Sequence, residues 1–303
     1  MQQDIKEVGF ESITTNQRLI NHDGSSNIRR RGINRFAAHN FYHSLVTMPV
    51  WSFLLVIVGF FILINVLFGT IYYFVGVEDI GVVPDMNYRP WVKMFFLSAQ
   101  TITSTGYGQI EPVSFWINVI SSTEALIGLM FFAIMTGVLY GRFSKPTAKL
   151  TYSKNAIITP FKDLTSLNIR IVNSKISQLI EVEAQLIVSL LVNNGNKLER
   201  IFLPVKLVND KVAILATIWN VMHVIDKNSP FYNMNEEEMK KSDVELIYMI
   251  KAIDDTYGQE VHTRTSYKWY EVIHSAKFAP AVKINKGVME VDIKKIGILE
   301  KIS

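Results

Sequence analysis

The sequence contains no cysteine, which excludes a disulfide framework and a thiolate metal site and leaves the redox compartment of the protein open. Its six histidines are scattered and show no metal-ligand spacing. The sequence also lacks a phosphate-binding loop, a nucleophile elbow and a nucleic-acid-binding motif. We therefore expect neither an enzyme nor a nucleic-acid-binding protein, and we expect no organic cofactor.

Charge is also missing from a long stretch, because the thirty residues from Met48 to Val77 include no Asp, Glu, Lys or Arg. As a helix this stretch would extend roughly 45 Å, which exceeds the ~30 Å hydrocarbon core of a bilayer. Trp51 near one end and Tyr72 and Tyr73 near the other fit the aromatic belts of a membrane interface. The stretch is predicted to span a membrane, in preference to forming a buried helix of a soluble protein.

A second apolar stretch, from about Val113 to Tyr140, carries a single charged residue, Glu124. The connection between the two stretches is acidic on balance, with Glu78, Asp79 and Asp85. Basic residues lie outside the pair instead: Arg29, Arg30, Arg31, Arg35, Arg142, Lys145 and Lys149. Because Lys and Arg favour the cytoplasmic side, we predict a two-span protein of the cell membrane with both termini in the cytoplasm.

Between the two spans lies a segment that is too short and too polar to cross the bilayer, Pro90 to Ile110. Its first part, PWVKMFFLSAQTIT, opens with proline and continues with apolar and aromatic residues, which predicts a short re-entrant helix over residues 90–103. The next residues, STGYG (104–108), are predicted to be extended backbone. Such backbone survives at membrane depth only where protein buries it or where it lines a wet cavity, so we expect it to line a pathway.

The residue types of STGYG suit a site made of backbone carbonyl oxygens, which is how potassium channels replace the hydration shell of an ion. Gly106 and Gly108 adopt positive φ without a Cβ clash, so that successive carbonyls can face one axis. Ser104 adds a hydroxyl at the inner end. One strand offers one carbonyl per layer, and the sequence holds one copy of the motif. Four strands would supply about eight oxygens per site, which predicts a homotetramer.

Several longer stretches resemble, in order, the bacterial branch of the inwardly rectifying potassium channel family. The segments DGSSNI (23–28) and FYHSL (41–45) resemble its N-terminal arm and its interfacial slide helix. The segment SSTEALIGLMFFAIMTGVLYGRFSKPTA (121–148) resembles its inner helix. Three segments resemble parts of its cytoplasmic β-domain: LNIRIVNSKISQLIEVEAQL (167–186), WNVMHVIDKNSPFY (219–232) and VHTRTSYKWYEVI (261–273). The resemblance implies K⁺ as the permeant ion.

The pattern and the resemblance together give the expected organisation. We expect an N-terminal arm (1–33), a slide helix (34–46), a transmembrane pore domain (47–144) and a cytoplasmic β-sandwich of immunoglobulin type (145–303). The parts expected in the pore domain are an outer helix (48–77), a pore helix (90–103), the filter (104–108) and an inner helix (113–142). Short strand-like stretches after Pro146 and a hairpin turn at Asn194 and Gly195 support the sandwich.

The filter departs from the family pattern, in which Thr and then Ile or Val precede GYG. Ser104 keeps the coordinating hydroxyl. Thr105 adds a hydroxyl behind the filter, and since a buried hydroxyl needs a partner, we expect it to bond within the network behind the filter, towards Glu124 or a water. Tyr107 is expected to point backwards and to brace the loop against aromatic residues of the pore helix, such as Phe95 and Phe96.

The inner helix carries the expected gate and the expected support of the filter. Phe132 and Tyr140 are eight positions apart and share a face with Thr136. The resemblance assigns the two rings to the lower gate, where they would close a dewetting constriction; packing against lipid or the first span is the alternative. Phe132 also stands where strongly rectifying relatives carry an acid that binds polyamines or Mg²⁺, so we expect weak rectification there. The resemblance puts Glu124 behind the filter as a brace, with a carboxylate that burial keeps neutral as the alternative.

Charged residues of the cytoplasmic part suggest two further sites. Glu181 and Glu183 would face one side of a strand, and the resemblance places the neighbourhood of Glu181 on the vestibule wall, where an acidic ring concentrates K⁺ and attracts polyamines or Mg²⁺. For Glu183 a solvated strand face is the alternative. Four basic residues would meet anionic lipid headgroups at roughly 1 kcal/mol each, or serve topology alone: Arg35, Arg142, Lys145 and Lys149.

Three functions are therefore open. The leading one is a homotetrameric, inward-rectifier-type potassium channel that is gated by its inner helices and its cytoplasmic domain. The second is a weakly selective cation channel, which Thr105 makes conceivable. The third is a membrane-anchored sensor with a non-conducting pore, against which the intact sequence Gly106-Tyr107-Gly108 argues.

Overall fold

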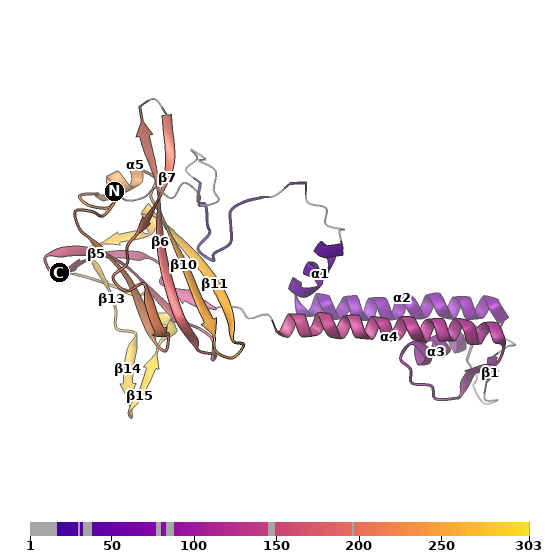
Figure 1. Ribbon diagram of the computed structural model, residues 1–303. Coiled ribbons are helices and arrows are strands. Elements are labelled where there is room, and N and C mark those ends of the chain that lie inside the picture. The colour runs from indigo at the N-terminus through magenta and orange to yellow at the C-terminus, as the bar shows by residue number, and fades with distance from the viewer. Residues whose placement is uncertain are drawn as a thin grey trace. The chain divides into compact units, whose positions relative to one another are not determined.

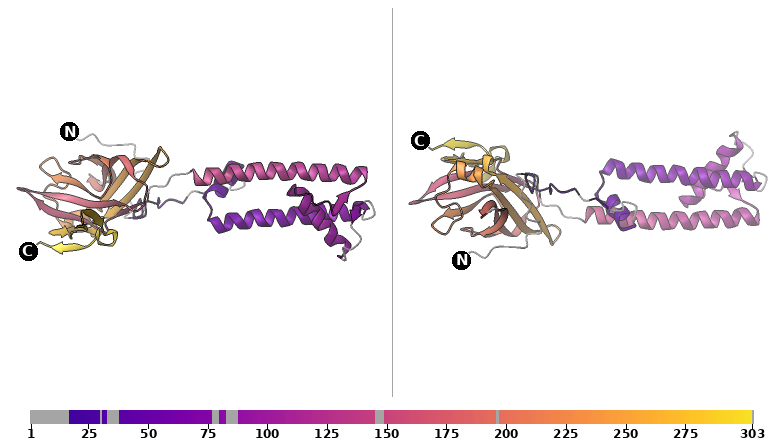
Figure 2. Two further views of the ribbon diagram at one scale, coloured as in Figure 1. Left: turned by 90° about the horizontal axis from the view of Figure 1, so that it is seen from below. Right: turned by 90° about the horizontal axis from the view of Figure 1, so that it is seen from above.

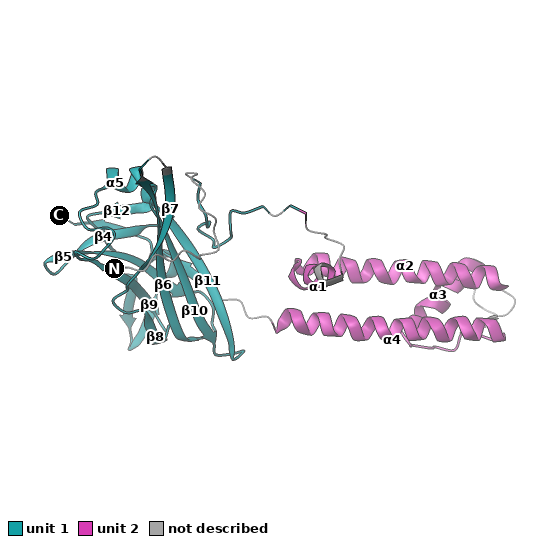
Figure 3. Ribbon diagram, turned by 45° about the horizontal axis from the view of Figure 1, so that its top comes forward, with its two compact units in different colours: residues 1–31, 146–303 teal, residues 32–145 magenta. Residues whose placement is uncertain are grey.

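The computed structural model describes residues 17–29, 31–32, 38–76, 80–82, 88–144, 149–195 and 197–302. The chain divides into a helical unit, residues 32–145, and a strand unit, residues 1–31 with 146–303. Figure 1 shows the elements of both units, and Figure 3 shows the units in different colours. The N-terminal arm therefore belongs with the strands, although the helical unit separates the two in sequence.

The helical unit contains two long apolar helices, α2 (Val50–Gly76) and α4 (Phe115–Phe143). Only 17% of the most apolar stretch of α2 and 11% of that of α4 is buried within the chain. The core helix of a soluble protein is apolar because it is buried, whereas these helices keep their apolar surfaces for lipid or for neighbouring chains. The two predicted spans are thus present as helices, and each begins two residues after its predicted start.

Three short elements complete the helical unit. The helix α1 (Ala38–Thr47) precedes α2, and α3 (Pro90–Ile102) takes the place of the predicted pore helix, with proline in its first turn. The strands β1 (Ile80–Val82) and β2 (Ile110–Pro112) form an antiparallel pair. In the views of Figure 2, α3 lies between α2 and α4, and side chains of these helices and of β2 share one apolar core: Phe68, Tyr72, Met94, Leu97, Ile110 and Ile117.

Two glycines bring the backbone of α3 close to both long helices. A Cβ atom at Gly69 of α2 would lie 3.1 Å from the backbone of Phe95, and one at Gly128 of α4 would lie 2.3 Å from the carbonyl oxygen of Ile102. Larger residues would therefore push α3 away. Since Ile102 is the last residue of α3, Gly128 sets the position at which the STGYG segment begins.

The strand unit is a sandwich of two five-stranded sheets. One has the order β11-β10-β6-β7, with β8 beside β6; the other has the order β12-β4-β5-β3, with β9 beside β5. The first sheet comprises β6 (Leu179–Asn194), β7 (Lys197–Val205), β8 (Lys211–Ile214), β10 (Glu245–Asp254) and β11 (Gln259–Lys268). The second comprises β3 (Leu150–Tyr152), β4 (Ala156–Phe161), β5 (Leu164–Asn173), β9 (Ile218–Ile225) and β12 (Val272–His274).

Smaller elements surround the sandwich. They are α5 (Glu236–Lys241), the 3₁₀ turns η2 (Trp269–Glu271) and η3 (Ile293–Lys295), and two antiparallel pairs, β13 (Ala276–Phe278) with β16 (Leu299–Lys301) and β14 (Val282–Asn285) with β15 (Val288–Val291). The helix α5 has the capping box of its Asn235 and Glu238. Glu236 and Lys240, and likewise Glu237 and Lys241, are four positions apart, the spacing at which opposite charges support a helix.

One apolar core fills the space between the two sheets. Alternate residues of facing strands contribute to it, as a sandwich requires: Leu167, Ile169 and Ile171 of β5, and Ala184, Leu186 and Val188 of β6. The predicted β-sandwich is therefore confirmed. The predicted hairpin is also present, because β6 and β7 pair down to Asn194 and Lys197, and Gly195 has a φ of 74°.

A β-bulge interrupts β6 at the acidic residues. Glu181 has a φ of 49°, and the register between β6 and β10 shifts between Lys251 and Ile253. Strict alternation, from which we expected Glu181 and Glu183 to face the same side, does not hold across such a bulge. Both residues nevertheless border one cavity of about 390 Å³ beside β8 and β10.

A buried histidine makes the stability of the strand unit depend on pH. His223 Nδ1 lies 2.7 Å from the carbonyl oxygen of Lys206, and Nε2 lies 2.8 Å from Ser229 Oγ. A carbonyl only accepts, so Nδ1 carries the proton and Nε2 accepts from the serine in the neutral ring. Burial lowers the pKa of His223, against smaller opposing effects of the Lys206 carbonyl and Asp226.

We predict that the free energy of unfolding falls as pH drops below about 6.5, the pKa of an unfolded histidine. In that range His223 binds a proton more readily in the unfolded state than in the folded state. The full free energy of unfolding is therefore present above this pH and decreases on acidification. Thermal unfolding of the full-length protein between pH 5 and 8 measures this dependence. His223→Asn should flatten it, because asparagine does not titrate. Equal pH profiles for parent and His223→Asn would contradict the prediction.

Candidate functional site

The STGYG segment follows α3 directly and has an alternating backbone. Thr103 caps α3, and the amides of Ser104 and Thr105 donate to the carbonyls of Thr101 and Gln100 at 3.0 and 2.9 Å. Three alternate residues then have positive φ: Ser104 at 54°, Gly106 at 54° and Gly108 at 76°. Alternation of positive and negative φ along an extended segment allows successive carbonyls to face one side. The sequence pointed to the two glycines, while the left-handed Ser104, rare for a residue with a Cβ, was not predicted.

Glu124 lies at the centre of a buried polar network behind this segment. Its Oε2 accepts a hydrogen bond from Tyr72 Oη at 2.6 Å, and its Oε1 contacts Ser98 Oγ. Ser98 Oγ also lies 2.9 Å from Asn65 Oδ1, and the Asn65 amide donates to the carbonyl of Phe61 at 2.6 Å. Glu124, Tyr72, Ser98 and Asn65 are all fully buried. The network therefore joins α2, α3 and α4 through hydrogen bonds.

Two of these contacts correct or extend the interpretation of the sequence. Tyr72 does not belong to an interfacial belt, because its side chain is fully buried and serves Glu124; Tyr73, by contrast, is 43% exposed. Asn65 was overlooked, although an amide within a charge-free apolar stretch is itself a signal, since such a group needs a partner at membrane depth.

The Thr105 hydroxyl has a partner, but not Glu124. Its Oγ1 lies 2.8 Å from Thr103 Oγ1, and the Thr103 hydroxyl donates to the Ala99 carbonyl at 2.7 Å. The expected contact of Thr105 with Glu124 is absent from the described part of the chain, where Tyr72 and Ser98 occupy that carboxylate. Thr105 is thus tied to the end of α3.

The aromatic residues of α3 contact one another and Tyr88, which precedes the helix. The Phe95 ring lies 5.8 Å from Trp91, the Phe96 ring lies 5.8 Å from Tyr88, and Phe95 and Phe96 are 6.0 Å apart. Tyr107 is 73% exposed. Within the ranges that the structure covers, Tyr107 makes no ring contact with Phe95 or Phe96 of its own chain, so the predicted brace is not formed inside one protomer.

The predicted gate residues project from α4. Phe132 and Tyr140 are 70% and 74% exposed, and Thr136, which donates to the Phe132 carbonyl at 2.8 Å, is exposed as well. The neighbouring Phe131, and not Phe132, stacks on Phe60 of α2, with centroids 3.9 Å apart. The alternative in which the gate rings pack against the first span is therefore not what this chain does.

The charges predicted to act on ions and lipids have different surroundings. Glu183 pairs with Lys211 at 3.6 Å, while Glu181 is exposed. Lys149 is exposed at the start of the strand unit. Arg142 is instead engaged within the helical unit, where it donates to the carbonyls of Leu45 and Met48. Arg35 and Lys145 lie outside the described residues.

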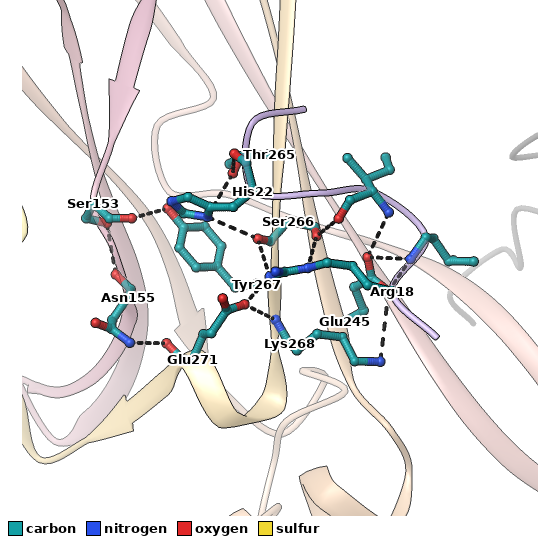
Figure 4. A network of polar contacts seen from close by, with 12 residues as sticks. Arg18, His22, Ser153, Asn155, Glu245, Thr265, Ser266, Tyr267, Lys268 and Glu271 are labelled. Atoms are coloured by element: carbon teal, nitrogen blue, oxygen red, sulfur yellow. Dashed lines mark hydrogen bonds and ion pairs between the residues drawn. The ribbon is translucent and has the colours of Figure 1, made fainter. Parts of the chain in front are cut away.

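An additional site that the sequence did not reveal is the seat of the N-terminal arm on the first sheet (Figure 4). The amides of Leu19 and Ile20 donate to the buried Glu245 carboxylate at 3.0–3.2 Å, and their side chains fill an apolar cluster. Arg18 pairs with Glu271.

Two successive residues of β11 donate hydrogen bonds to backbone carbonyls of the arm. The Thr265 hydroxyl donates to the carbonyl of His22, and the Ser266 hydroxyl donates to the carbonyl of Ile20. Glu245 is in turn 4.0 Å from buried Lys268, which pairs with Asp243 at 2.6 Å.

Comparison with known proteins agrees with this description. A family model described as "Ion channel" matches residues 60–145, and a model described as "Inward rectifier potassium channel C-terminal domain" matches residues 150–303. The two matches meet at the boundary between the helical unit and the strand unit. The class is therefore that of ion channels, not of enzymes.

Relatives cover most of the chain. The inward rectifier potassium channel Kirbac3.1 of Paramagnetospirillum magnetotacticum is 30% identical over 272 residues, which are 89% of this chain and 91% of that protein. The G protein-activated inward rectifier potassium channel 4 of Homo sapiens is 24% identical over 91% of this chain and 71% of that protein. The G protein-activated inward rectifier potassium channel 2 of Mus musculus is also 24% identical, over 91% of this chain and 70% of that protein. The chain belongs to the inward rectifier potassium channel family.

We predict that Tyr72→Phe destabilises the helical unit by about 1–3 kcal/mol, because it leaves one oxygen of the buried Glu124 carboxylate without a donor. The thermal unfolding midpoint of the detergent-solubilised protein measures the effect. Tyr73→Phe is a matched control, because it removes the same hydroxyl from a half-exposed neighbour. A midpoint that falls equally in both variants, or in neither, would count against the network.

Proposed function

We propose that four copies of this chain surround one axis and conduct K⁺ through a filter formed by residues 104–108. The observation that carries the proposal is the positive φ at Ser104, Gly106 and Gly108, because it turns the carbonyls of consecutive residues to one side of an extended segment. K⁺ is the ion whose hydration shell such carbonyl rings replace. Membership of the inward rectifier potassium channel family supports the same ion.

The exposure of the filter segment in one protomer supports assembly into a homotetramer. Residues 103–109 are exposed in the single chain, and one strand offers too few oxygens for a dehydrated ion. Neighbouring copies would complete each ring of oxygens and would cover Tyr107, which its own chain leaves open. The C-terminal end of α3 precedes the filter directly, and its partial negative charge favours a cation nearby.

The gate in this proposal consists of Phe132, Thr136 and Tyr140. All three are exposed on α4, and the ring that stacks on α2 is the neighbouring Phe131. Four copies of the exposed side chains can therefore meet on the axis and exclude water. The absence of an acid at position 132 fits weak rectification. Glu181 and Glu183 would line the cytoplasmic vestibule and attract K⁺, polyamines or Mg²⁺. The partner Lys211 weakens this role for Glu183.

The membrane setting of the proposal has both termini in the cytoplasm, which the Lys and Arg bias supports. Anionic lipid headgroups would be bound by Lys149, together with Arg35 and Lys145. The resemblance had also given Arg142 this role. The contacts of its guanidinium with the carbonyls of Leu45 and Met48 favour a different one.

Flux into liposomes tests the function. We predict that the purified protein takes up Rb⁺ without comparable uptake of Na⁺, since a carbonyl cage fitted to K⁺ also accepts Rb⁺. Protein-free liposomes give the background. Comparable uptake of both ions would favour a weakly selective cation channel, and uptake of neither would favour a membrane-anchored sensor.

Two substitutions in the filter test which residues carry selectivity. Gly106→Ala should abolish Rb⁺ uptake, because φ at this residue is 54° and a Cβ is strained there. Thr105→Val should retain the ratio of Rb⁺ to Na⁺ uptake within about twofold, since the Thr103 hydroxyl still has the Ala99 carbonyl to bind. A collapse of the ratio in Thr105→Val would make the Thr105 hydroxyl part of the filter.

A further inference from the structure

Arg142 lies in the last turn of α4, and its guanidinium contacts the end of α1. Nη1 donates to the carbonyl of Leu45 at 2.5 Å, and Nη2 donates to the carbonyl of Met48 at 2.8 Å. Leu45 is in the last turn of α1, and Met48 follows that helix directly. The last carbonyls of a helix have no partners within it and carry partial negative charge. Arg142 therefore caps α1 from another helix, with two nitrogens on two different carbonyls.

The same guanidinium also contacts α2. The central guanidinium carbon, Arg142 Cζ, lies 4.7 Å from the centroid of the Phe53 ring, which is a cation–π arrangement. Phe53 is 1% exposed and belongs to an apolar cluster with Leu45 of α1 and Val138 of α4. One side chain of α4 thus holds α1 through hydrogen bonds and α2 through an aromatic face.

A second contact between α1 and α4 lies next to the first. A Cβ atom at Gly141 would lie 3.0 Å from Tyr42 Oη, so the glycine leaves room for the tyrosine of α1 against α4. Tyr140, one position earlier, is the proposed gate ring and is 74% exposed. The residues of α4 that contact α1 therefore lie in the same turn as Tyr140, one residue of the proposed gate.

We propose that Arg142 is a positioning residue of the gate: it fixes the end of α1 to the end of α4, so that α1 and Tyr140 move together. Its charge is used by the carbonyls of α1 and by Phe53, and headgroup binding falls to the other basic residues. The proposal rests on the proposed function only for the identity of the gate. The planar, two-pronged guanidinium is essential to it, because an ammonium cannot serve two carbonyls and a ring face in the same way.

Substitutions that separate charge from shape test the proposal. The full-length protein is reconstituted in vesicles of phosphatidylcholine with increasing phosphatidylglycerol, and the initial rate of Rb⁺ uptake is measured. Arg142→Lys and Arg142→Gln should both change this rate about fivefold or more, in the same direction, since each breaks the coupling. The phosphatidylglycerol content that produces half of the maximal change in uptake rate should stay at the parent value in both variants. Lys149→Gln, at an exposed basic residue, should shift this content and serves as the control.

Cross-linking measures the attachment without flux. The chain has no native cysteine, so Tyr42→Cys and Gly141→Cys introduce a unique pair that a short bismaleimide can join within one protomer. The yield should fall at least twofold when Arg142→Lys is added. Gel filtration checks that each variant keeps the assembly state of the parent.

Three results would overturn the proposal. If Arg142→Lys conducts like the parent while Arg142→Gln shifts the lipid dependence, Arg142 is a headgroup ligand. If both variants conduct like the parent, the residue does not position the gate. If the cross-linking yield is unchanged by Arg142→Lys, α1 is held without the guanidinium. A parent protein that takes up no Rb⁺ would refute the proposed function instead, and the cross-linking yield would still report on the attachment.

Discussion

The structure depends on holding irregular backbone at membrane depth, where no water completes its hydrogen bonds. The STGYG segment is neither helix nor sheet, so its start has to be fixed from outside. Two contacts do this. The buried Glu124 carboxylate joins α3 to α2 and α4, and Gly128 lets α4 touch the last carbonyl of α3. A buried carboxylate without hydrogen-bond partners would destabilise the fold. Because Glu124 needs Ser98 of α3 as a partner, its burial restricts the position of α3.

The strand unit uses the same principle to hold the N-terminal arm. The arm is bound largely through its main chain, because Glu245 accepts its amides and β11 side chains donate to its carbonyls. The apolar side chains of Leu19 and Ile20 add burial. Removing the arm would leave the fully buried Glu245 without these donors. The arm is therefore a structural part of the strand unit, and the chain from it leads directly into α1.

Much of the fold could be predicted because apolar patterns report local structure. The length of two apolar stretches, one without charge and one with the single charge of Glu124, predicted α2 and α4. Proline and the aromatic run predicted α3, and the strand patterns predicted the sandwich. The features that the sequence did not predict depend on contacts between residues that are distant in sequence. Tyr72 looks like a belt residue in the sequence, but its side chain is fully buried and donates to Glu124 of α4. The contact of Arg142 with the carbonyls of α1 is likewise not visible in the sequence. The bulge at Glu181 arises from the pairing of β6 with β10, which no single strand reveals.

The residues of α4 show how one helix serves both the scaffold and the pathway. Six residues that contact other elements of the chain follow one another at spacings of four and three: Glu124, Gly128, Phe131, Met135, Val138 and Arg142. This is the stripe that one face of a helix presents along its length. Phe132, Thr136 and Tyr140 each stand beside the stripe and are exposed. In the proposed assembly, a rotation of α4 that carried the rings of Phe132 and Tyr140 off the pore axis would pull the stripe from its partners, so the contacts that build the scaffold would also limit how the proposed gate can move.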